Sequence, residues 1–225
     1  MTLPSLFCGP PPDRETFVQQ HSIPFSPEHW LNRLPESWMY DLLGEYASHG
    51  QTWPRISRQT VIDTASQINT VREAVQFYVM ASAWGVGVNQ RFVTRRVWVL
   101  TRNENAGERL LAGLRIAQQT SAVAAYTSFR HGGPNRLVHL GPGFFTKIVY
   151  FGSWDDSPAR RPLILDRFVA AALNDVAGLG WAPTWNWSPA QYGQYLDLAA
   201  EWASKWGTQP DVVEKTLFDH GHLFK

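Results

Sequence analysis

Apolar side chains recur every three or four positions along most of this 225-residue chain, which is the spacing of one face of an α-helix. Cap-forming residues, prolines and glycines bound these periodic segments. Ser26, Pro27 and Glu28, for example, combine an N-cap, a proline at the first helical position and an acid in the first turn. No clear strand run and no repeat period emerges. The pattern predicts an all-α fold with short connections.

An irregular, Pro-rich arm over residues 1–25 precedes the expected helices. Gly85-Val86-Gly87 is expected to interrupt one helix, and Gly132-Gly133-Pro134 to end another. The Trp- and Pro-rich residues 181–187 are expected to form a loop. We expect helices over residues 26–34, 38–50, 57–68, 70–84, 89–100 and 105–129, a short one from 135, one directly after a turn at 140–143, and others over 166–176, 188–206 and 211–218.

The composition is that of a folded protein with a substantial core. Apolar residues make up 44% of the chain and charged residues only 17%, which argues against disorder. The length suffices for one domain, or for two tightly joined lobes. The formal net charge is +1, so the chain is no polycationic coat for nucleic acid, although a local basic patch stays open.

Cysteine, histidine and the N-terminal residues exclude further classes. Cys8 is the single cysteine, so neither an internal disulfide nor a four-cysteine iron–sulfur cluster is expected. His220 and His222 lie near the C-terminus without a third ligand, so we expect no metal site, and no other cofactor. The first residues lack the basic region of a signal peptide, and no apolar run is long enough to cross a bilayer. We therefore expect a cytoplasmic protein.

One lysine stands in an otherwise apolar run. The chain has four lysines against sixteen arginines, so Lys147, between Phe144-Phe145-Thr146 and Ile148-Val149-Tyr150, is not surface filler. An amine in such surroundings is costly to keep charged, and its uncharged form has the lone pair that a nucleophilic lysine needs. Asp166 lies nineteen residues later, after the apolar Leu163-Ile164-Leu165. A Gly-Pro-Gly turn, a lysine and an aspartate in this order suggest a two-residue active site.

This order of elements resembles the helix-hairpin-helix DNA glycosylases, most closely their bacterial 8-oxoguanine-glycosylase-like branch. The hairpin of that family has the form L-P-G-V-G-T-K, and its aspartate lies in a V-D segment after an apolar stretch. Pro142, Gly143, Thr146 and Lys147 fit the hairpin, and Leu165-Asp166 fits the aspartate segment at a similar separation. Neither motif alone is specific, but the pair is moderately so.

The resemblance implies a single compact helical domain over residues 1–225, with two helical lobes, a cleft, and a hairpin and catalytic segment over 135–175. The family's N-terminal sheet lobe is not expected here. Such an enzyme extrudes a nucleotide and cleaves the bond between base and sugar, leaving an abasic site. Lys147 would attack the anomeric carbon and form a Schiff base, which can permit strand cleavage. Asp166 would offset the positive charge that develops on the sugar, and would orient or deprotonate the lysine.

The resemblance also assigns contacts with DNA to the hairpin. Its backbone N–H groups would hold a phosphate beside the lesion, at Gly141, Gly143, Phe145 and Thr146. Phe145 replaces the family's second hairpin glycine, which alters how closely the backbone can approach a phosphate. The implied partner is double-stranded DNA that contains a modified base, bound by a monomer.

Asn89, Gln90 and Arg91 weakly resemble the family's segment that fills the void left by the extruded base. Their side chains have the donors needed to pair with the orphaned partner base. A Gly-rich helix junction with a polar cap explains them equally well. Arg91, Arg95 and Arg96 are likewise either a phosphate track or a solvated helix face.

Three aromatic residues are candidates for the base pocket. Phe151 stands four residues after the lysine, where animal 8-oxoguanine enzymes carry a cysteine that stacks on the flipped base. Trp181 and Trp185, in the loop after the catalytic segment, are placed to stack on a bulky base or sugar. Oxidised guanine is the substrate that the resemblance implies. The changed pocket and the abundance of aromatic residues make a bulky phage-type base, such as glucosylated hydroxymethylcytosine, a serious competitor in a defence setting.

Each of these interpretations has a simpler competitor. Lys147 can extend from an apolar helix to solvent, and Asp166 can serve only as an N-cap. The whole chain is then a noncatalytic DNA-binding module that keeps the hairpin for phosphate contact. A third alternative is a Trp-rich carbohydrate binder, which predicts affinity for free oligosaccharide without DNA.

Overall fold

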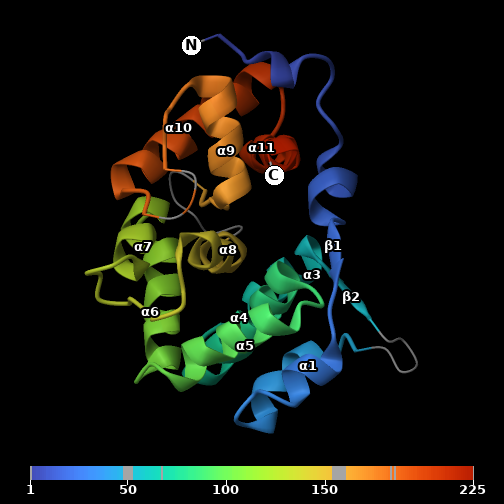
Figure 1. Ribbon diagram of the computed structural model, residues 1–225, viewed down its shortest axis with the longest axis vertical. Coiled ribbons are helices and arrows are strands. Elements are labelled where there is room, and N and C mark those ends of the chain that lie inside the picture. Colours follow the sequence, from blue (N-terminus) through green and yellow to red (C-terminus); the bar gives the residue numbers. More distant parts are fainter. Residues whose placement is uncertain are drawn as a thin grey trace.

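The computed structural model describes residues 2–47, 53–66, 68–153, 161–182, 184 and 186–224. Within these residues the chain is mostly helical, with one two-stranded sheet near the N-terminus (Figure 1). The all-α prediction is confirmed, and the helical structure is consistent with the fold that the resemblance implies. None of the described helices is long and apolar enough to cross a membrane.

The first part of the chain forms short elements followed by longer helices. In order they are η1 Ser5–Phe7, η2 Glu15–Gln19, β1 Ser22–Pro24, α1 Pro27–Leu31, η3 Ser37–Tyr40, α2 Asp41–Gly44, β2 Arg55–Ser57, α3 Arg58–Ala65, α4 Val71–Val86, α5 Gln90–Thr101, α6 Ala106–Gln119 and α7 Ala122–Phe129. The second part contains α8 Pro142–Gly152, α9 Arg167–Ala177, α10 Pro189–Trp206, α11 Pro210–Gly221 and η4 His222–Phe224.

Local capping chemistry explains most of the helix starts. The side chain of Ser26 accepts a hydrogen bond from the His29 N–H at the start of α1, as predicted. Thr70 and Ser188 form reciprocal capping boxes that open α4 and α10. Each cap satisfies N–H groups that a helix start leaves without partners.

The single helix predicted over residues 105–129 is wrong, because the structure has two helices there. Thr120 leaves the helical conformation, and Ser121 then caps α7 by accepting a hydrogen bond from the Ala124 N–H. The break lets α7 fold back against α6, with the Phe129 ring over Gly113. A Cβ at Gly113 would lie 2.1 Å from that ring, so the glycine permits the contact.

Two other predicted boundaries differ from the structure. Helix α4 does not stop at Gly85 but runs to Val86, and it ends at Gly87, whose φ of 62° suits glycine. Gly85 is retained inside the helix because it faces α8: a Cβ there would lie 2.9 Å from the Phe144 ring. The short helix expected from Asn135 is also absent, since residues 134–139 form turns.

The small sheet was not predicted. β1 and β2 pair antiparallel, with Ser22 opposite Ser57 and Ile23 opposite Ile56. Each strand has only three residues, too few to show an alternating pattern. The sheet ties the N-terminal arm to the start of α3, and the arm is anchored again where Phe7 packs on Trp202 and Trp206.

Helix α8 lies in the middle of the molecule (Figure 1). It packs against α3, α4, α6 and α7, and all its residues from Phe145 to Gly152 are buried. Helix α8 and its neighbours form one group of helices in Figure 1, and α9, α10 and α11 form a second group. The extended residues 163–165 lead into α9. One apolar cluster runs through both groups, and the division into two lobes with a cleft stays a prediction.

Candidate active site

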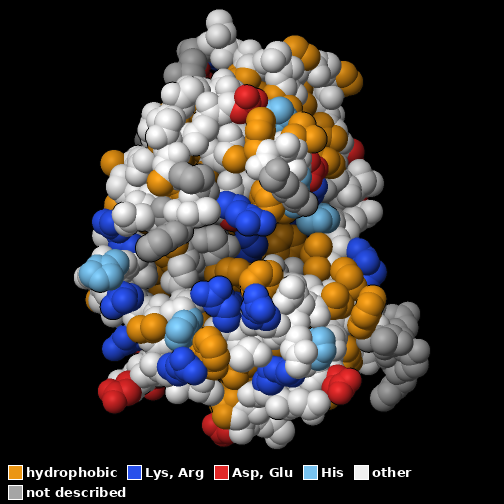
Figure 2. Space-filling view, in the orientation of Figure 1, with side chains coloured by type: hydrophobic (Ala, Val, Ile, Leu, Met, Phe, Trp, Pro, Cys, Tyr) orange, Lys and Arg blue, Asp and Glu red, His pale blue; other side chains and the backbone are white. Residues whose placement is uncertain are grey.

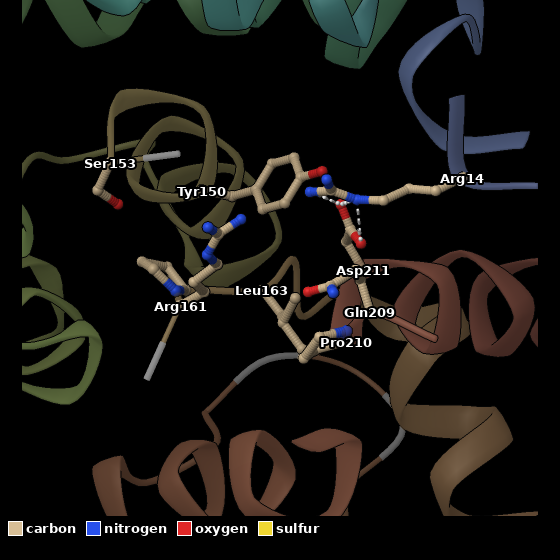
Figure 3. A pocket seen from close by; sticks show the side chains of 9 residues that line it. Arg14, Tyr150, Ser153, Arg161, Leu163, Gln209, Pro210 and Asp211 are labelled. Atoms are coloured by element: carbon tan, nitrogen blue, oxygen red, sulfur yellow. Dashed lines mark hydrogen bonds and ion pairs between the residues drawn. The ribbon is translucent and has the colours of Figure 1, made fainter. Parts of the chain in front are cut away.

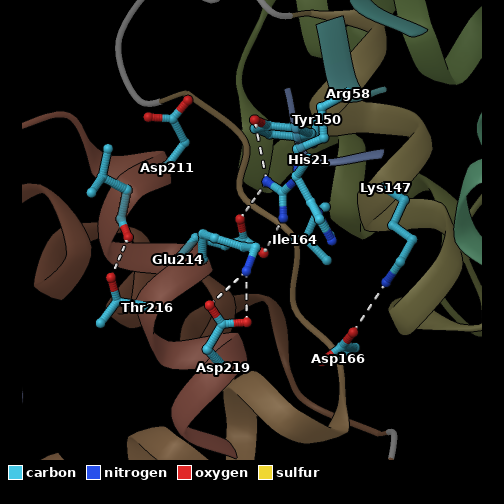
Figure 4. Close-up of polar contacts among 12 residues, drawn as sticks. His21, Arg58, Lys147, Tyr150, Ile164, Asp166, Asp211, Glu214, Thr216 and Asp219 are labelled. Carbon is cyan, nitrogen blue, oxygen red and sulfur yellow. Dashed lines mark hydrogen bonds and ion pairs between the residues drawn. The ribbon is translucent and has the colours of Figure 1, made fainter. Parts of the chain in front are cut away.

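The structure brings Lys147 and Asp166 together. Lys147 lies in α8, Asp166 is the N-cap of α9, and their Nζ and Oδ2 atoms are 3.1 Å apart (Figure 4). The side chains are only 9% and 14% exposed, so little water reaches this contact. An amine and a carboxylate in contact, partly shielded from water, can exchange a proton without a mediator.

Lys147 is held in place by more than the aspartate. Its Nζ also donates to the carbonyl oxygen of Gly143, one turn earlier in α8, at 2.9 Å. Its aliphatic stem runs along α4, where a Cβ at Gly85 would lie 3.3 Å from Lys147 Cδ. The amine is therefore confined to the first turn of α8, beside Asp166.

Asp166 serves two elements at once. Its Oδ1 accepts hydrogen bonds from the backbone N–H groups of Phe168 and Val169, at 3.0 and 3.3 Å, which caps α9. Its Oδ2 faces Lys147. The carboxylate lies at the positive end of the α9 dipole. The N-cap interpretation is thus correct, and it leaves the second oxygen available for chemistry.

The hairpin residues divide into open and buried positions. Gly141 is the N-cap of α8 and is exposed, and Gly143 in the first turn is partly exposed. Phe145 is 1% exposed and stacks on Phe129, so only its backbone remains for a contact with DNA. Thr146 is also 1% exposed, and its hydroxyl bonds inside the protein rather than facing outward.

Basic side chains surround the start of α8. Arg96 on α5 donates from NH2 to the carbonyl oxygen of His139 at 2.9 Å, and its guanidinium lies 3.9 Å from the centre of the Phe144 ring. Burial lowers the pKa of Arg96. Arg91 and Arg95 on the same helix are exposed. Figure 2 shows Lys and Arg side chains gathered over α5 and α8, with few acids among them.

Asn89 caps α5 by accepting a hydrogen bond from the Phe92 N–H at 3.3 Å. The polar-cap interpretation of this residue is therefore correct. Gln90 and Arg91 are exposed in the first turn of the same helix, beside the exposed Phe92. The structure thus places Gln90 and Arg91 on the surface, where their donors are open to a ligand.

The two aromatic pocket candidates that the structure describes, Phe151 and Trp181, have partners other than the Lys147–Asp166 pair. Phe151 lies one turn after Lys147 on the same face of α8, but it is fully buried and packs edge-to-face on Trp84. Trp181 exchanges two backbone hydrogen bonds with the side chain of Asn174, two turns along α9 from Asp166. Trp185 lies outside the described residues.

Sequence reasoning missed a buried polar cluster beside the site. Arg58, the first residue of α3, forms an ion pair with Glu214 of α11, and its NH1 also lies 3.4 Å from the Tyr150 hydroxyl (Figure 4). The His21 ring packs edge-to-face on Trp84, and burial, with Arg58 nearby, lowers the pKa of His21 to about 4. No local sequence pattern predicts these contacts of Arg58 and His21, because the partners are far apart in the chain.

A small pocket of about 10 Å³ is lined by Tyr150 but not by Lys147 or Asp166. It lies between Arg161 and the Arg14–Asp211 ion pair (Figure 3). No group of three potential metal ligands occurs in the described part of the chain. His220 is instead bonded to Asp175, and His222 stacks on Phe168.

Comparison with known families decides what kind of protein carries this site. The family described as "Putative 8-oxoguanine DNA glycosylase OGG-like protein" matches residues 16–218. The chain belongs to this family. The match supports a DNA glycosylase with DNA as its partner, and it includes both Lys147 and Asp166. No curated protein and no solved structure matches this OGG-like chain.

Proposed function

We propose that this OGG-like protein excises a modified base from double-stranded DNA by means of Lys147 and Asp166, leaving an abasic site. The observation that carries the proposal is the 3.1 Å contact between the amine and the carboxylate beside the exposed start of α8. Each group supplies one part of the chemistry that removal of a base requires. The proposed enzyme acts as a cytoplasmic monomer.

The proposed reaction begins with a proton transfer. Lys147 passes a proton to Asp166, and the free amine attacks the anomeric carbon of an extruded nucleotide. The new C–N bond forms as the bond between sugar and base breaks, and the base leaves with the electron pair and takes up a proton. Opening of the sugar ring then gives a Schiff base, which either hydrolyses or permits strand cleavage. Asp166 supplies the proton that the base takes up, and the restored carboxylate then offsets the positive charge on the sugar and on the Schiff base.

The proposed DNA contacts use the surface around this pair. The N–H groups at the start of α8, near Gly141 and Gly143, suit a phosphate because they lie at the positive end of a helix dipole, where no side chain caps the helix. Arg91 and Arg95 on α5 add positive charge on the same side of the molecule. Asn89 and Gln90 stand at the start of α5, where we propose that they fill the void left by the base.

The proposed substrate is either 8-oxoguanine or a bulky phage-type base such as glucosylated hydroxymethylcytosine. The family description favours the first. The second is suggested by the replacement of the family's stacking cysteine with Phe151, which packs against Trp84 and so does not supply the contact that 8-oxoguanine enzymes use. Removal of a phage-type base would be a defence reaction, and release of each base from matched duplexes separates the two.

The test measures base release from duplexes that carry 8-oxoguanine, glucosylated hydroxymethylcytosine or no modification. Wild-type protein is expected to release one of the modified bases, and Lys147→Ala to release none. Lys205→Ala is the matched control, because Lys205 is an exposed lysine paired with Glu201 on α10. Activity that survives in Lys147→Ala, or is lost in Lys205→Ala as well, contradicts the proposed role of Lys147.

A noncatalytic DNA-binding module is the second candidate. It is favoured by the structural roles that both residues already have, since Asp166 caps α9 and Lys147 binds the Gly143 carbonyl. Such a module would bind duplex DNA with Lys147→Ala unchanged in affinity and would release no base from any duplex. The base-release assay therefore distinguishes the two candidates directly.

A further inference from the structure

The short segment that carries Asp166 crosses the interior without a strand partner. Leu163, Ile164 and Leu165 are each no more than 1% exposed and lie outside any helix or sheet. Buried backbone N–H and C=O groups must nevertheless be hydrogen-bonded. Side-chain hydroxyls take the place of a neighbouring strand here.

Three hydroxyl groups bond to this backbone. The Tyr192 hydroxyl accepts from the Leu163 N–H at 3.2 Å and lies 2.9 Å from the Leu163 carbonyl oxygen. The Tyr195 hydroxyl donates to the Ile164 carbonyl oxygen at 3.1 Å. Both tyrosines belong to α10, a different helix from the one that carries Lys147.

Thr146 supplies the third hydroxyl, and it comes from the helix that carries the lysine. Its Oγ1 accepts from the Leu165 N–H at 3.1 Å and donates to the Pro142 carbonyl oxygen at 2.6 Å. Leu165 directly precedes Asp166, and Thr146 directly precedes Lys147. One buried side chain therefore joins the two elements whose separation defines the candidate site.

We propose that Thr146 is a positioning residue, which fixes the Lys147 amine relative to the Asp166 carboxylate through the Leu165 N–H. This inference rests on the proposed function. The β-branched side chain of Thr146 is stiff at χ1, and its burial leaves no solvent to replace the hydrogen bond. The resemblance had assigned this residue to DNA, but its hydroxyl is fully engaged within the protein. Small displacements of reacting groups lower a reaction rate by large factors, so a hydrogen bond that fixes their separation supports catalysis.

Thr146→Val is the direct test, because it keeps the shape and removes only the hydroxyl. Single-turnover base release by this variant is expected to fall at least about tenfold, with the Kd for duplex DNA within about threefold of wild type. Thr146→Ser is expected to restore most of the rate. Tyr195→Phe is the matched control, because it also removes a hydroxyl that bonds to this segment, at Ile164. That hydroxyl comes from α10 and not from the helix that carries Lys147, so the rate of base release should equal that of wild type.

Different outcomes overturn different claims. Wild-type protein that releases no base from any duplex overturns both the proposed function and the positioning role. Wild-type activity together with an equally active Thr146→Val overturns the positioning role alone. A rate loss in Tyr195→Phe as large as in Thr146→Val, or a Thr146→Ser variant as slow as the valine variant, also overturns it. Assays at 10 °C with circular dichroism check folding, and Thr146→Ala replaces the valine variant if needed. Unfolding of both hydroxyl-free variants would mean a purely structural role.

Discussion

Arg58 and Glu214 form a buried ion pair between the start of α3 and the C-terminal helix α11. Their NH1 and Oε2 atoms are 2.6 Å apart, and the side chains are 1% and 0% exposed. Burial alone would lower the pKa of Arg58, but the Glu214 carboxylate raises it, so the arginine keeps its charge. The pair joins parts of the chain 156 residues apart, and Arg58 also contacts Tyr150 of the helix that carries Lys147.

Breaking this pair is expected to destabilise the protein strongly. Arg58→Met leaves the Glu214 carboxylate buried without a cation, which costs about 3–5 kcal/mol. The double variant Arg58→Met with Glu214→Leu is expected to recover most of the loss, because no uncompensated charge remains. Urea denaturation of the three proteins measures both effects. A single variant within about 1 kcal/mol of wild type would contradict the buried pairing.

Asp166→Asn separates the capping role of this residue from its chemical role. Asparagine caps helices about as well as aspartate, so the free energy of unfolding should fall by no more than about 2 kcal/mol. Base release should fall at least about 100-fold, because the amide offers no negative charge to the sugar or the amine. Single-turnover assays, DNA affinity and thermal denaturation provide the measurements. Unfolding of this variant would show that capping is its main role.

Arg91 and Arg95 are expected to contact phosphates. Replacing either with alanine should weaken binding to modified and unmodified duplexes alike, and should reduce the slope of log K against log salt by about one. Arg72→Ala is a suitable control, since Arg72 is exposed but already paired with Asp41 on another surface element. Unchanged salt slopes in both α5 variants would identify these arginines as a solvated helix face.

His21 is expected to make stability depend on pH. Its pKa is lowered to about 4 in the folded chain, against 6.5 for an ordinary histidine, so protonation favours the unfolded state. Its contribution is fully present above about pH 6.5 and is lost as the pH falls towards 4. Urea denaturation at several pH values should show a shallower decline in His21→Gln than in wild type. The exposed His131→Gln variant should follow wild type, and identical slopes in all three proteins would contradict the burial effect.

The helices were predictable where the signals that start them are local. Ser26, Thr70 and Ser188 cap helices that the sequence placed correctly, because a cap and the N–H groups it satisfies lie within one turn. The break at Ser121 was missed since alanine-rich flanks favour a continuous helix, and only the packing of Phe129 on Gly113 explains the fold-back. Strands of three residues carry too little pattern to be detected.

The candidate site was predictable to the extent that it follows a motif. Lys147 and Asp166 belong to a spacing that a family resemblance assigns, and the structure places their side chains in contact. The Arg58–Glu214 pair and the burial of His21 depend on tertiary contacts, which no local spacing encodes. The Thr146 hydroxyl points into the core, where it bonds to the segment before Asp166. This contact is also tertiary, so the sequence did not predict it.

Borohydride trapping on DNA that carries the excised base tests the central claim most directly. Reduction of a Schiff base would link the protein covalently to the sugar, and peptide mapping locates the link. The account predicts an adduct at Lys147 that is absent in Lys147→Ala and strongly reduced in Asp166→Asn. Base release without any adduct, or an adduct at a residue other than Lys147, would contradict it.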